Sequence, residues 1–324
     1  MKKNEWLAHS ILIDGQGGAE AIAWNDIRDR QPEHGILWVH LNFEHPDAEQ
    51  WLREDSGIND IASSALLSQE SRPRTVTRGD NLLLALRGVN LNPGEVPEDM
   101  VSIRIWTDGK RVISTFRRNL LAVDDVLAQF EDTNGPTSVA DWLVSLNDSL
   151  VRRMSDTIEN LEDKLLSLEE RILSGDLDGL RYQLAYLRKQ ALGIRRFLSP
   201  QREALNRLVS ERLSWMDELN LLRLREVNDR LIRYIEDLDE MRERASIAQD
   251  EMLSTISEQM NERSYVLTIV AALFLPLGFF TGLMGINVGG MPGVEEEAGF
   301  WTVTGLCLVI VAMLGAVFRL KKWL

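Results

Sequence analysis

The residue best suited to meet a cation is Asn287, which follows Gly285 and Ile286 at the end of a long uncharged run. Its neutral amide attracts the water shell of a cation, and a ring of such amides would not hold the ion too tightly to leave. The alternative is that Asn287 only ends a helix, since asparagine is favoured at helix C-terminal positions. The tripeptide Gly285-Ile286-Asn287 carries no signal by itself. If Asn287 lies at the mouth of an ion path, the three residues form a candidate selectivity motif, with Asn287 acting on a metal ion through its hydration shell.

The helix that precedes this motif would carry a stripe of small or apolar residues on one face. Going back from Asn287 at steps of three and four, the stripe consists of Gly282, Gly278, Leu275, Ala271, Leu267 and Ser264. It offers no carboxylate or histidine to replace the water of a tightly hydrated dication, so ions would pass at least partly hydrated. Leu267 and Leu275 are natural constrictions that could gate by dewetting. The spacing of Gly278 and Gly282 first indicates close helix packing in a membrane.

Three acidic side chains and two histidines are weaker candidates. Glu295, Glu296 and Glu297 lie beyond the motif and would attract cations from outside, although a solvated loop explains them equally well. His40 and His45 bracket several oxygen-bearing side chains, which is suitable chemistry for a cytoplasmic metal site. Because His40 ends an apolar strand, a structural histidine is the better interpretation.

Composition and missing motifs exclude several other functions. The formal net charge of -14 repels nucleic acid and concentrates cations near the surface. The single cysteine, Cys307, lies inside an apolar run, so no disulfide framework or thiolate zinc cluster can form within one chain. No phosphate-binding loop occurs in the sequence, which argues against nucleotide hydrolysis. Neither an enzyme nor a bound cofactor is indicated.

Two uncharged segments, 264–284 and 300–318, are each long enough to cross a hydrocarbon core of ~30 Å. The loop 285–299 between them is acidic and lacks Lys and Arg, whereas the tail 319–324 is basic. The positive-inside rule then places both termini in the cytoplasm and the loop outside. No signal peptide is evident at the N-terminus. We therefore expect a multi-pass protein in the lipid bilayer of a bacterial-type inner membrane.

The part before the membrane divides into three segments. Residues 1–137 show short apolar strands with turn signals such as Asp108-Gly109, which predicts a cytoplasmic α/β domain with a sheet covered by helices. Residues 138–216 predict a helical hairpin, with Ser199-Pro200 ending its second helix. Residues 217–263 predict a stalk helix that continues unbroken into the first span. The expected fold class is thus an α+β membrane protein with two transmembrane helices.

The stalk has an apolar seam at steps of mostly three and four, which is typical of a coiled coil. Its members are Val227, Leu231, Tyr234, Leu238, Met241, Ala245, Ala248, Met252, Ile256 and Met260. The alternative is a helix that packs on its own domain, which the unbroken run into the membrane disfavours. The stalk is also acidic, which forms either a plain solvated face or, in a symmetric bundle, a region of raised cation concentration.

The tripeptide Gly285-Ile286-Asn287, placed after a stalk helix at the end of the penultimate span, resembles the Gly-Met-Asn signature of the CorA superfamily of divalent-cation transporters. Isoleucine in the middle, with Gly-Gly-Met-Pro-Gly following at 289–293, is similar to the ZntB zinc-transporter branch of that superfamily. Other matching pieces are Glu70-Ser71-Arg72-Pro73-Arg74, Asp108-Gly109 before Val112-Ile113-Ser114-Thr115, Leu187-Arg188-Lys189-Gln190, Pro200-Gln201-Arg202 and Lys322-Trp323-Leu324. The resemblance covers essentially the whole chain.

This resemblance implies a homopentamer with a funnel-shaped cytoplasmic domain, in which the first span lines the pore and the second forms an outer ring. It implies that Asn287 lies at the outer mouth, and the change from methionine to Ile286 favours zinc over magnesium as the transported ion. It also raises proton coupling, and the direction of transport stays open. Independently, two spans per chain cannot enclose an ion path, so several chains must combine.

The leading hypothesis is therefore a transporter of zinc, or more broadly of divalent metal ions, with no nucleic acid or nucleotide as partner. The runner-up is a magnesium or cobalt channel of the same architecture. A third hypothesis, from another class, is a membrane-tethered signalling or scaffold protein whose coiled coil transmits a cytoplasmic event. Metal flux into liposomes distinguishes the three.

Overall fold

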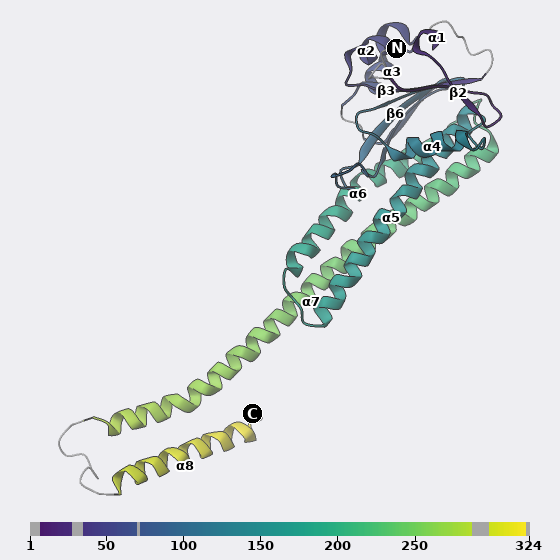
Figure 1. Ribbon diagram of the computed structural model, residues 1–324. Helices are drawn as coiled ribbons and strands as arrows, with labels where there is room; N and C mark the ends of the chain where they lie inside the picture. The colour runs from purple at the N-terminus through teal and green to yellow at the C-terminus, as the bar shows by residue number, and fades with distance from the viewer. Residues whose placement is uncertain (1–6, 28–34, 70–71, 287–297, 322–324) are drawn as a thin grey trace. The chain divides into compact units, whose positions relative to one another are not determined.

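The structure is a computed structural model that describes residues 7–27, 35–69, 72–286 and 298–321. Contacts within the chain divide it into two compact units, Met1–Gln249 and Asp250–Leu324. The boundary falls inside the longest helix, α7 (Glu218–Met284), which therefore belongs to both units (Figure 1).

The first unit contains a seven-stranded mixed sheet in the order β2-β1-β3-β7-β6-β5-β4. The strands are β1 (Leu7–Ile13), β2 (Ala19–Ala21), β3 (Ile36–Asn42), β4 (Arg74–Arg78), β5 (Asn81–Gly88), β6 (Val101–Thr107) and β7 (Arg111–Phe116). The β3–β7 pair is parallel and the other pairs are antiparallel. The predicted sheet covered by helices is confirmed.

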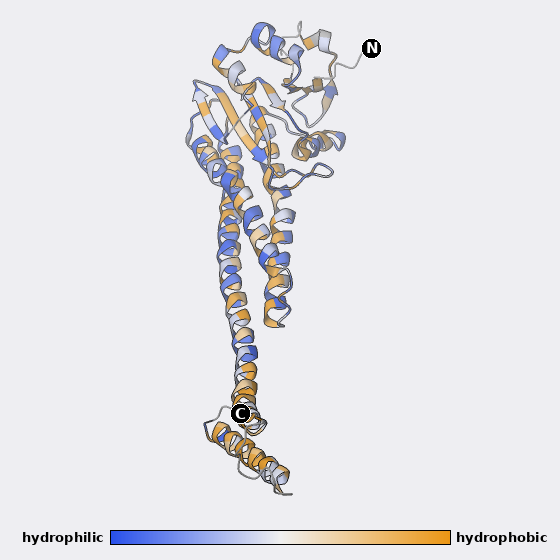
Figure 2. Cartoon of the chain, turned by 90° about the vertical axis from the view of Figure 1, so that its left-hand side faces the viewer, coloured by the Kyte–Doolittle hydropathy of each residue, from blue (hydrophilic) through white to orange (hydrophobic). Residues whose placement is uncertain are grey.

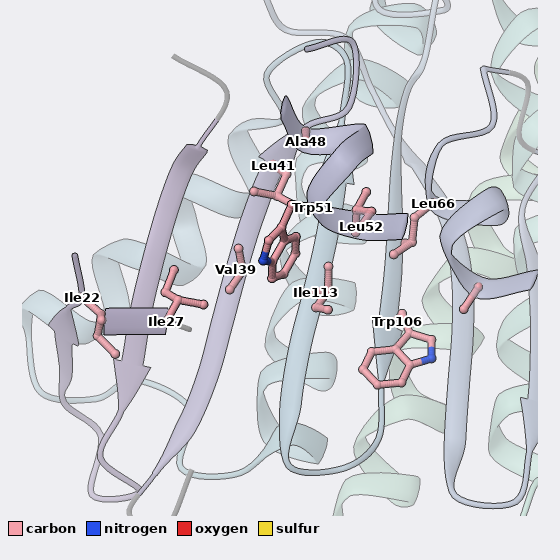
Figure 3. Packing of buried hydrophobic residues seen from close by; sticks show 11 residues of the cluster. Ile22, Ile27, Val39, Leu41, Ala48, Trp51, Leu52, Leu66, Trp106 and Ile113 are labelled. Atoms are coloured by element: carbon pink, nitrogen blue, oxygen red, sulfur yellow. The ribbon is translucent and has the colours of Figure 1, made fainter. Parts of the chain in front are cut away.

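Short helices cover one face of this sheet. They are α1 (Trp24–Ile27), α2 (Pro46–Gln50), the π-helical turn η1 (Trp51–Asp55) and α3 (Asp60–Leu66). In Figure 3, Trp51, Leu52 and Leu66 from these helices lie over Val39 and Ile113 of the strands, and all five are buried. Removing this apolar surface from water fixes the helices on the sheet, with α3 lying over β6.

Longer helices cover the opposite face. They are α4 (Leu121–Glu131), α5 (Val139–Leu173) and α6 (Leu180–Ser210). Trp142 of α5 meets Trp38 of β3 edge to face, with ring centroids 4.9 Å apart. Thr75 Oγ1 of β4 donates a hydrogen bond to the carbonyl oxygen of Ala204 in α6, at 2.6 Å. The helical hairpin is therefore anchored on the sheet through both of its helices.

The second hairpin helix is longer than the sequence indicated. The prediction that Ser199-Pro200 ends it is wrong, because α6 continues through this proline to Ser210. Leu205 beyond the proline is fully buried, and Gln201 Oε1 accepts a hydrogen bond from the backbone N–H of Arg87 at 2.7 Å. Packing against the sheet thus outweighs the local penalty of an interior proline, which is about 3 kcal/mol.

The connection from α6 to α7 is fastened to two turns of the sheet. Trp215 Nε1 donates to the carbonyl of Asp80, and the backbone N–H of Ser214 donates to the Asp80 carboxylate, both at 2.8 Å. In the turn between β6 and β7, Gly109 has a φ of 83°, and a Cβ there would come within 2.3 Å of the Trp215 ring. Glycine is required both for the left-handed backbone and for this close approach. The sheet therefore positions the start of α7.

The apolar seam of α7 is buried within its own chain. It packs with α5 and α6 in a three-helix bundle, where Ile235 takes the place expected for Tyr234 and burial ends at Met252. Polar links join α7 to these helices: Arg223–Asp141, Arg230–Asp148 and Arg244–Glu169 to α5, and Asn228–Asn206, Asp239–Arg195 and Gln249–Arg188 to α6. Packing on its own domain, disfavoured from the sequence, is the arrangement found, so the seam gives no support for assembly of several chains.

The prediction of one unbroken helix from stalk to membrane is confirmed by α7, which passes through Pro276 without interruption. The final helix is α8 (Gly299–Leu320). Both helices contain windows long and apolar enough to cross a membrane by length and composition, with mean hydropathies of 2.2 and 2.3. Figure 2 shows the hydrophobic colouring along α8 and the last turns of α7.

Candidate functional site

The candidate ion-conducting surface is one face of α7 between Ser264 and Gly282. These residues are about five helical turns, or ~27 Å, apart, which is close to the thickness of a hydrocarbon core. Because the helix is unbroken, the predicted stripe residues between them lie on the same face. All are exposed, with Leu267 at 71% and Leu275 at 73%. No described part of the chain covers this face.

Contacts within the chain do not explain Gly278 and Gly282. A Cβ added at either position would meet nothing within 4 Å. Glycine costs about 1 kcal/mol relative to alanine in a helix interior, so two glycines on one face need another reason. The close approach of a neighbouring helix, or the width of an aqueous path, supplies such a reason.

The polar groups of this span are neutral. Thr268 Oγ1 donates to the carbonyl of Ser264 at 2.8 Å, and Thr281 Oγ1 donates to the carbonyl of Leu277 at 2.9 Å. Pro276 has no N–H, so the carbonyl of the residue four positions earlier loses its helical partner. A free carbonyl is tolerated in a membrane where another helix or pore water satisfies it. Such neutral oxygens suit an ion that keeps its water.

The motif itself is only partly within the described residues. The backbone N–H of Gly285 donates to the carbonyl of Gly282 at 3.1 Å, and Ile286 follows as the last described residue of this segment. Asn287 lies outside the described residues, and so do Glu295 to Glu297. Their roles at the mouth of an ion path stay predictions.

The second span begins with an aromatic pair that sequence reasoning did not single out. Phe300 and Trp301 have ring centroids 5.5 Å apart and are 72% and 73% exposed. Aromatic side chains concentrate at membrane–water interfaces. Arg319 occupies the last turn of the same helix. The two ends of this span could have been recognised in the sequence from the aromatic pair at one end and the basic residue at the other.

His40 is a buried structural residue. It is 1% exposed, its Nδ1 lies 2.7 Å from Ser114 Oγ, and its ring stacks on Phe116 with centroids 4.4 Å apart. Burial, and to a lesser extent the neighbouring His9, lower the pKa of His40 to about 3, while the bond to Ser114 acts in the opposite direction. The imidazole is therefore neutral at physiological pH.

His45 has a different local task, because it caps α2. Its Nδ1 accepts a hydrogen bond from the backbone N–H of Asp47 at 3.3 Å, and the Asp47 carboxylate lies 3.7 Å away. Among the residues that the structure describes, no group of three or more His, Cys, Asp or Glu side chains is arranged to hold a metal ion. Both histidines thus have a structural explanation.

A sheet-containing domain, one long helix and two candidate membrane spans together define a membrane-protein architecture. The family described as "CorA-like Mg2+ transporter protein" matches residues 33–322, and the chain belongs to this CorA family of divalent-cation transporters. The resemblance in the sequence is thereby confirmed.

Relatives match over nearly the full chain. It is 36% identical over 319 residues to the zinc transport protein ZntB of Pectobacterium carotovorum subsp. carotovorum, covering 98% of this chain and 95% of the relative. It is 38% identical over 328 residues to the divalent cation transporter CmaX of Pseudomonas aeruginosa, covering 98% and 97%. The solved structure of full-length CmaX matches with a TM-score of 0.86 at 38% identity, over 100% of both chains. Both relatives are named as transporters, which agrees with the expectation that the chain is not an enzyme.

Proposed function

We propose that this chain carries zinc across a membrane through a pore formed by several copies, with the 264–282 face of α7 lining the path. The observation that carries the proposal is that this face is uncharged and uncovered in a member of a divalent-cation transporter family. One full-length relative is named a zinc transport protein, and Gly285-Ile286-Asn287 replaces Gly-Met-Asn. Both points favour zinc over magnesium.

The way an ion would travel follows from what this face lacks. It carries no carboxylate, imidazole or thiolate, so a dication that lost its water would find no replacement ligands. The ion therefore keeps part of its water shell, and the neutral amide of Asn287 attracts that shell at the outer mouth. Rings formed by Leu267 and Leu275 narrow the path and gate it by dewetting.

Several copies are needed because two spans cannot enclose an aqueous path. The family resemblance makes a homopentamer the specific proposal. The exposed face of α7 and the unexplained Gly278 and Gly282 support close packing of this helix against other copies. A mass measurement in detergent that finds only monomer or dimer contradicts the proposal.

The proposed location is the inner membrane of a bacterial cell, with both termini in the cytoplasm. Basic residues flank the cytoplasmic ends of the spans, and the acidic segment 285–299 lies outside, where Glu295 to Glu297 attract cations. A cysteine placed at Gly293 should react with an impermeant reagent added to intact cells. A cysteine placed after Lys322 should not.

A magnesium or cobalt channel of the same architecture is the second candidate, because the family description names Mg2+. Ion coupling, including proton coupling, is compatible with either candidate. Neither 264–284 nor 300–318 contains a carboxylate or histidine, so a proton-coupling carboxylate or histidine would lie in the stalk, the loop or the cytoplasmic unit.

The deciding experiment measures radioactive zinc uptake into liposomes that contain the purified protein, under imposed zinc and proton gradients. Zinc uptake above that of protein-free vesicles supports the proposal, and its dependence on each gradient reports coupling and direction. Magnesium is then added as a competitor in the same vesicles. Strong magnesium uptake with no zinc movement selects the second candidate, and absence of both fluxes removes the transport proposal.

A further inference from the structure

A groove between α3 and the edge of the sheet is apolar inside and basic along its rim. Ile61 of α3 is 72% exposed, Val76 of β4 is 43% exposed, and Leu83 of β5 lies between them. Two adjoining hollows of about 660 and 230 Å³ share these three residues. Arg74 lines the first hollow and Arg78 the second, and neither makes an ion pair with a described residue. We call this surface the α3–β4 groove.

The start of α7 carries a surface of the opposite character. Leu219 and Leu222 are 65% and 54% exposed, and Glu218, Glu226 and Asp229 lie beside them. Helical spacing puts these five residues on the side of α7 that points away from the buried seam. The three carboxylates make no ion pair with the described residues. We call this surface the acidic α7 face.

The charges of the two surfaces remain opposite when all their ionised neighbours are included. Asp60 also lines the α3–β4 groove, where it is outnumbered by Arg74 and Arg78. Arg225 lies at the margin of the acidic α7 face, and Arg233 lies one turn beyond Asp229; the three carboxylates outnumber these two arginines. Complementary potentials of this kind guide association and fix the relative register of two partners.

One chain cannot bring these two surfaces together. The groove belongs to the face of the sheet covered by α3, whereas α6 packs on the opposite face and α7 is joined to α5 and α6. Each surface is exposed within the chain, so neither covers the other. Complementary surfaces on opposite sides of one subunit make a head-to-tail contact, which closes into a ring when the rotation allows it.

We propose that the α3–β4 groove of one subunit receives the acidic α7 face of the next subunit. Leu219 and Leu222 enter between Ile61 and Val76, and the carboxylates of the face meet the arginines of the rim. This inference rests on the proposed homo-oligomer and deepens it. Because α7 is unbroken from Glu218 to Met284, the proposed contact at its start and the proposed pore-lining face belong to the same helix.

The contact is tested by cross-linking the full-length protein in membranes, with Cys307 replaced by serine. The variant Ile61→Cys with Leu222→Cys places one thiol on each surface. Mild oxidation should give a ladder of covalent dimers, trimers and larger species up to the closed ring. Each single-cysteine variant should give no ladder. A second pair, Val76→Cys with Leu219→Cys, tests the same contact should the first pair fold poorly.

A matched control pairs Ile61→Cys with Leu192→Cys on α6, which is 53% exposed and so as accessible as Leu222. This control should stay at the background of the single-cysteine variants. The mass of the parent oligomer in detergent is measured in parallel. An oligomer of three or more subunits without a ladder from either pair, or with a ladder that stops at the dimer, overturns the contact and leaves the transport proposal standing. A parent protein that is only monomeric or dimeric overturns both.

Charge reversal provides an independent test of the proposed contact. Arg78→Glu and Glu226→Arg should each lower the cross-linking rate about tenfold at low salt, which corresponds to ~1.4 kcal/mol of interface energy. The double variant should recover most of the parent rate, because the pair is restored with opposite sign. Equal rates in all four proteins, or a double variant as slow as the slower single variant, would show that these side chains do not meet.

Discussion

The two units of this chain differ in what covers their apolar residues. In the first unit, both faces of the sheet and the seam of α7 are buried by the chain itself. In the second unit, Met252 and Phe318 are the buried hydrophobic residues among those described, although this unit has the more hydrophobic sequence. Its apolar surface is therefore available to lipid and, in the proposed oligomer, to other copies of the chain.

This difference separates two kinds of explanation. A residue such as Trp142 is explained by its neighbours in one subunit, so changing it should affect folding first. Gly278 and the exposed leucines of the span have no such neighbours, so changing them should affect assembly or transport first.

The largest effect is expected at Asn287. Replacement by alanine removes the neutral amide that attracts hydrated cations and leaves the apolar span unchanged. Zinc flux in liposomes should fall to that of protein-free vesicles, while the oligomer mass in detergent is retained. Flux that stays at the parent rate would make Asn287 a helix terminator and would remove the proposed motif.

The companion variant Asn287→Asp distinguishes loss of the amide from a change of charge. A ring of carboxylates would bind a dication more strongly, and conduction requires a site weak enough to leave. Uptake should therefore saturate at lower zinc and be blocked by zinc, with altered selectivity over magnesium. Simple inactivity without block would indicate damage to the pore instead.

Gly278 should reveal the second unit's dependence on neighbouring copies. Valine here meets nothing within the chain and is a better helix former than glycine, so a single subunit should tolerate it. Where helices of other copies approach closely, the added methyl groups should lower the oligomeric fraction about tenfold, or by ~1.4 kcal/mol. Native mass measurement checks this. The matched control Gly305→Val on α8, also without neighbours in the chain, should assemble normally, because the resemblance puts the second span in the outer ring, away from the contacts between pore-lining helices.

Trp142 should behave in the opposite way, because its neighbours are within the subunit. Alanine at this fully buried position removes the contact with Trp38 and should lower the free energy of unfolding by about 3–5 kcal/mol. Denaturant unfolding of the detergent-solubilised protein provides the measurement. Tyr182→Ala, at a position 81% exposed, should change it by less than about 0.5 kcal/mol. Similar losses in the two variants would contradict the burial of Trp142.

Much of the first unit could be predicted from local pattern, and the failures have a common cause. Alternation of apolar residues and the Asp108-Gly109 turn indicated the strands, since both signals are local. Pro200 misled because its local preference is overridden by packing with the distant Arg87 and the sheet. The α7 seam misled because a heptad pattern states that a helix is covered and does not state by which chain.

For the candidate site, the sequence predicted which residues share a face but not what covers that face. A stripe such as Leu267 to Gly282 follows from helix periodicity alone, once the helix is unbroken. The structural role of His40 was already the preferred interpretation, because this residue ends an apolar strand. Its bond to Ser114 and the cap that His45 places on α2 required the structure. What covers the stripe lies outside one chain, so neither the sequence nor a single subunit contains it.

A smaller effect should come from the burial of His40 in the first unit, and it should appear in the pH dependence of stability. The pKa of His40 is about 3 in the folded protein and about 6.5 when exposed, so the unfolded state binds the additional proton between these values. Stability from the neutral imidazole is complete above pH 6.5 and should decline by up to ~1.4 kcal/mol per pH unit as the pH falls toward 3. Unfolding measured from pH 7 to about 5 should show a shallower slope in His40→Gln. An unchanged slope would place the proton elsewhere.

The smallest effect concerns one position of the α5–α7 interface at which α7 carries an acidic residue without an ion pair to α5 among the described residues. Arg223, Arg230 and Arg244 of α7 pair with acids of α5, and their spacing leaves one heptad position between the last two. That position is Asp237, whose pKa is raised first by desolvation and then by Glu162 and the acids beside it on α7.

Glu162 repels the carboxylate of Asp237, whereas it would attract an arginine at this position. Asp237→Arg should therefore raise the free energy of unfolding by about 0.2–1 kcal/mol, the range of exposed ion pairs, and the gain should shrink as salt rises. Asp237→Asn, which removes the repulsion without adding a pair, should lie between the parent and the arginine variant. Because the seam is covered by its own chain, neither change should alter the oligomer mass in detergent. A change of oligomer mass with unchanged stability would mean that this side of α7 faces another copy.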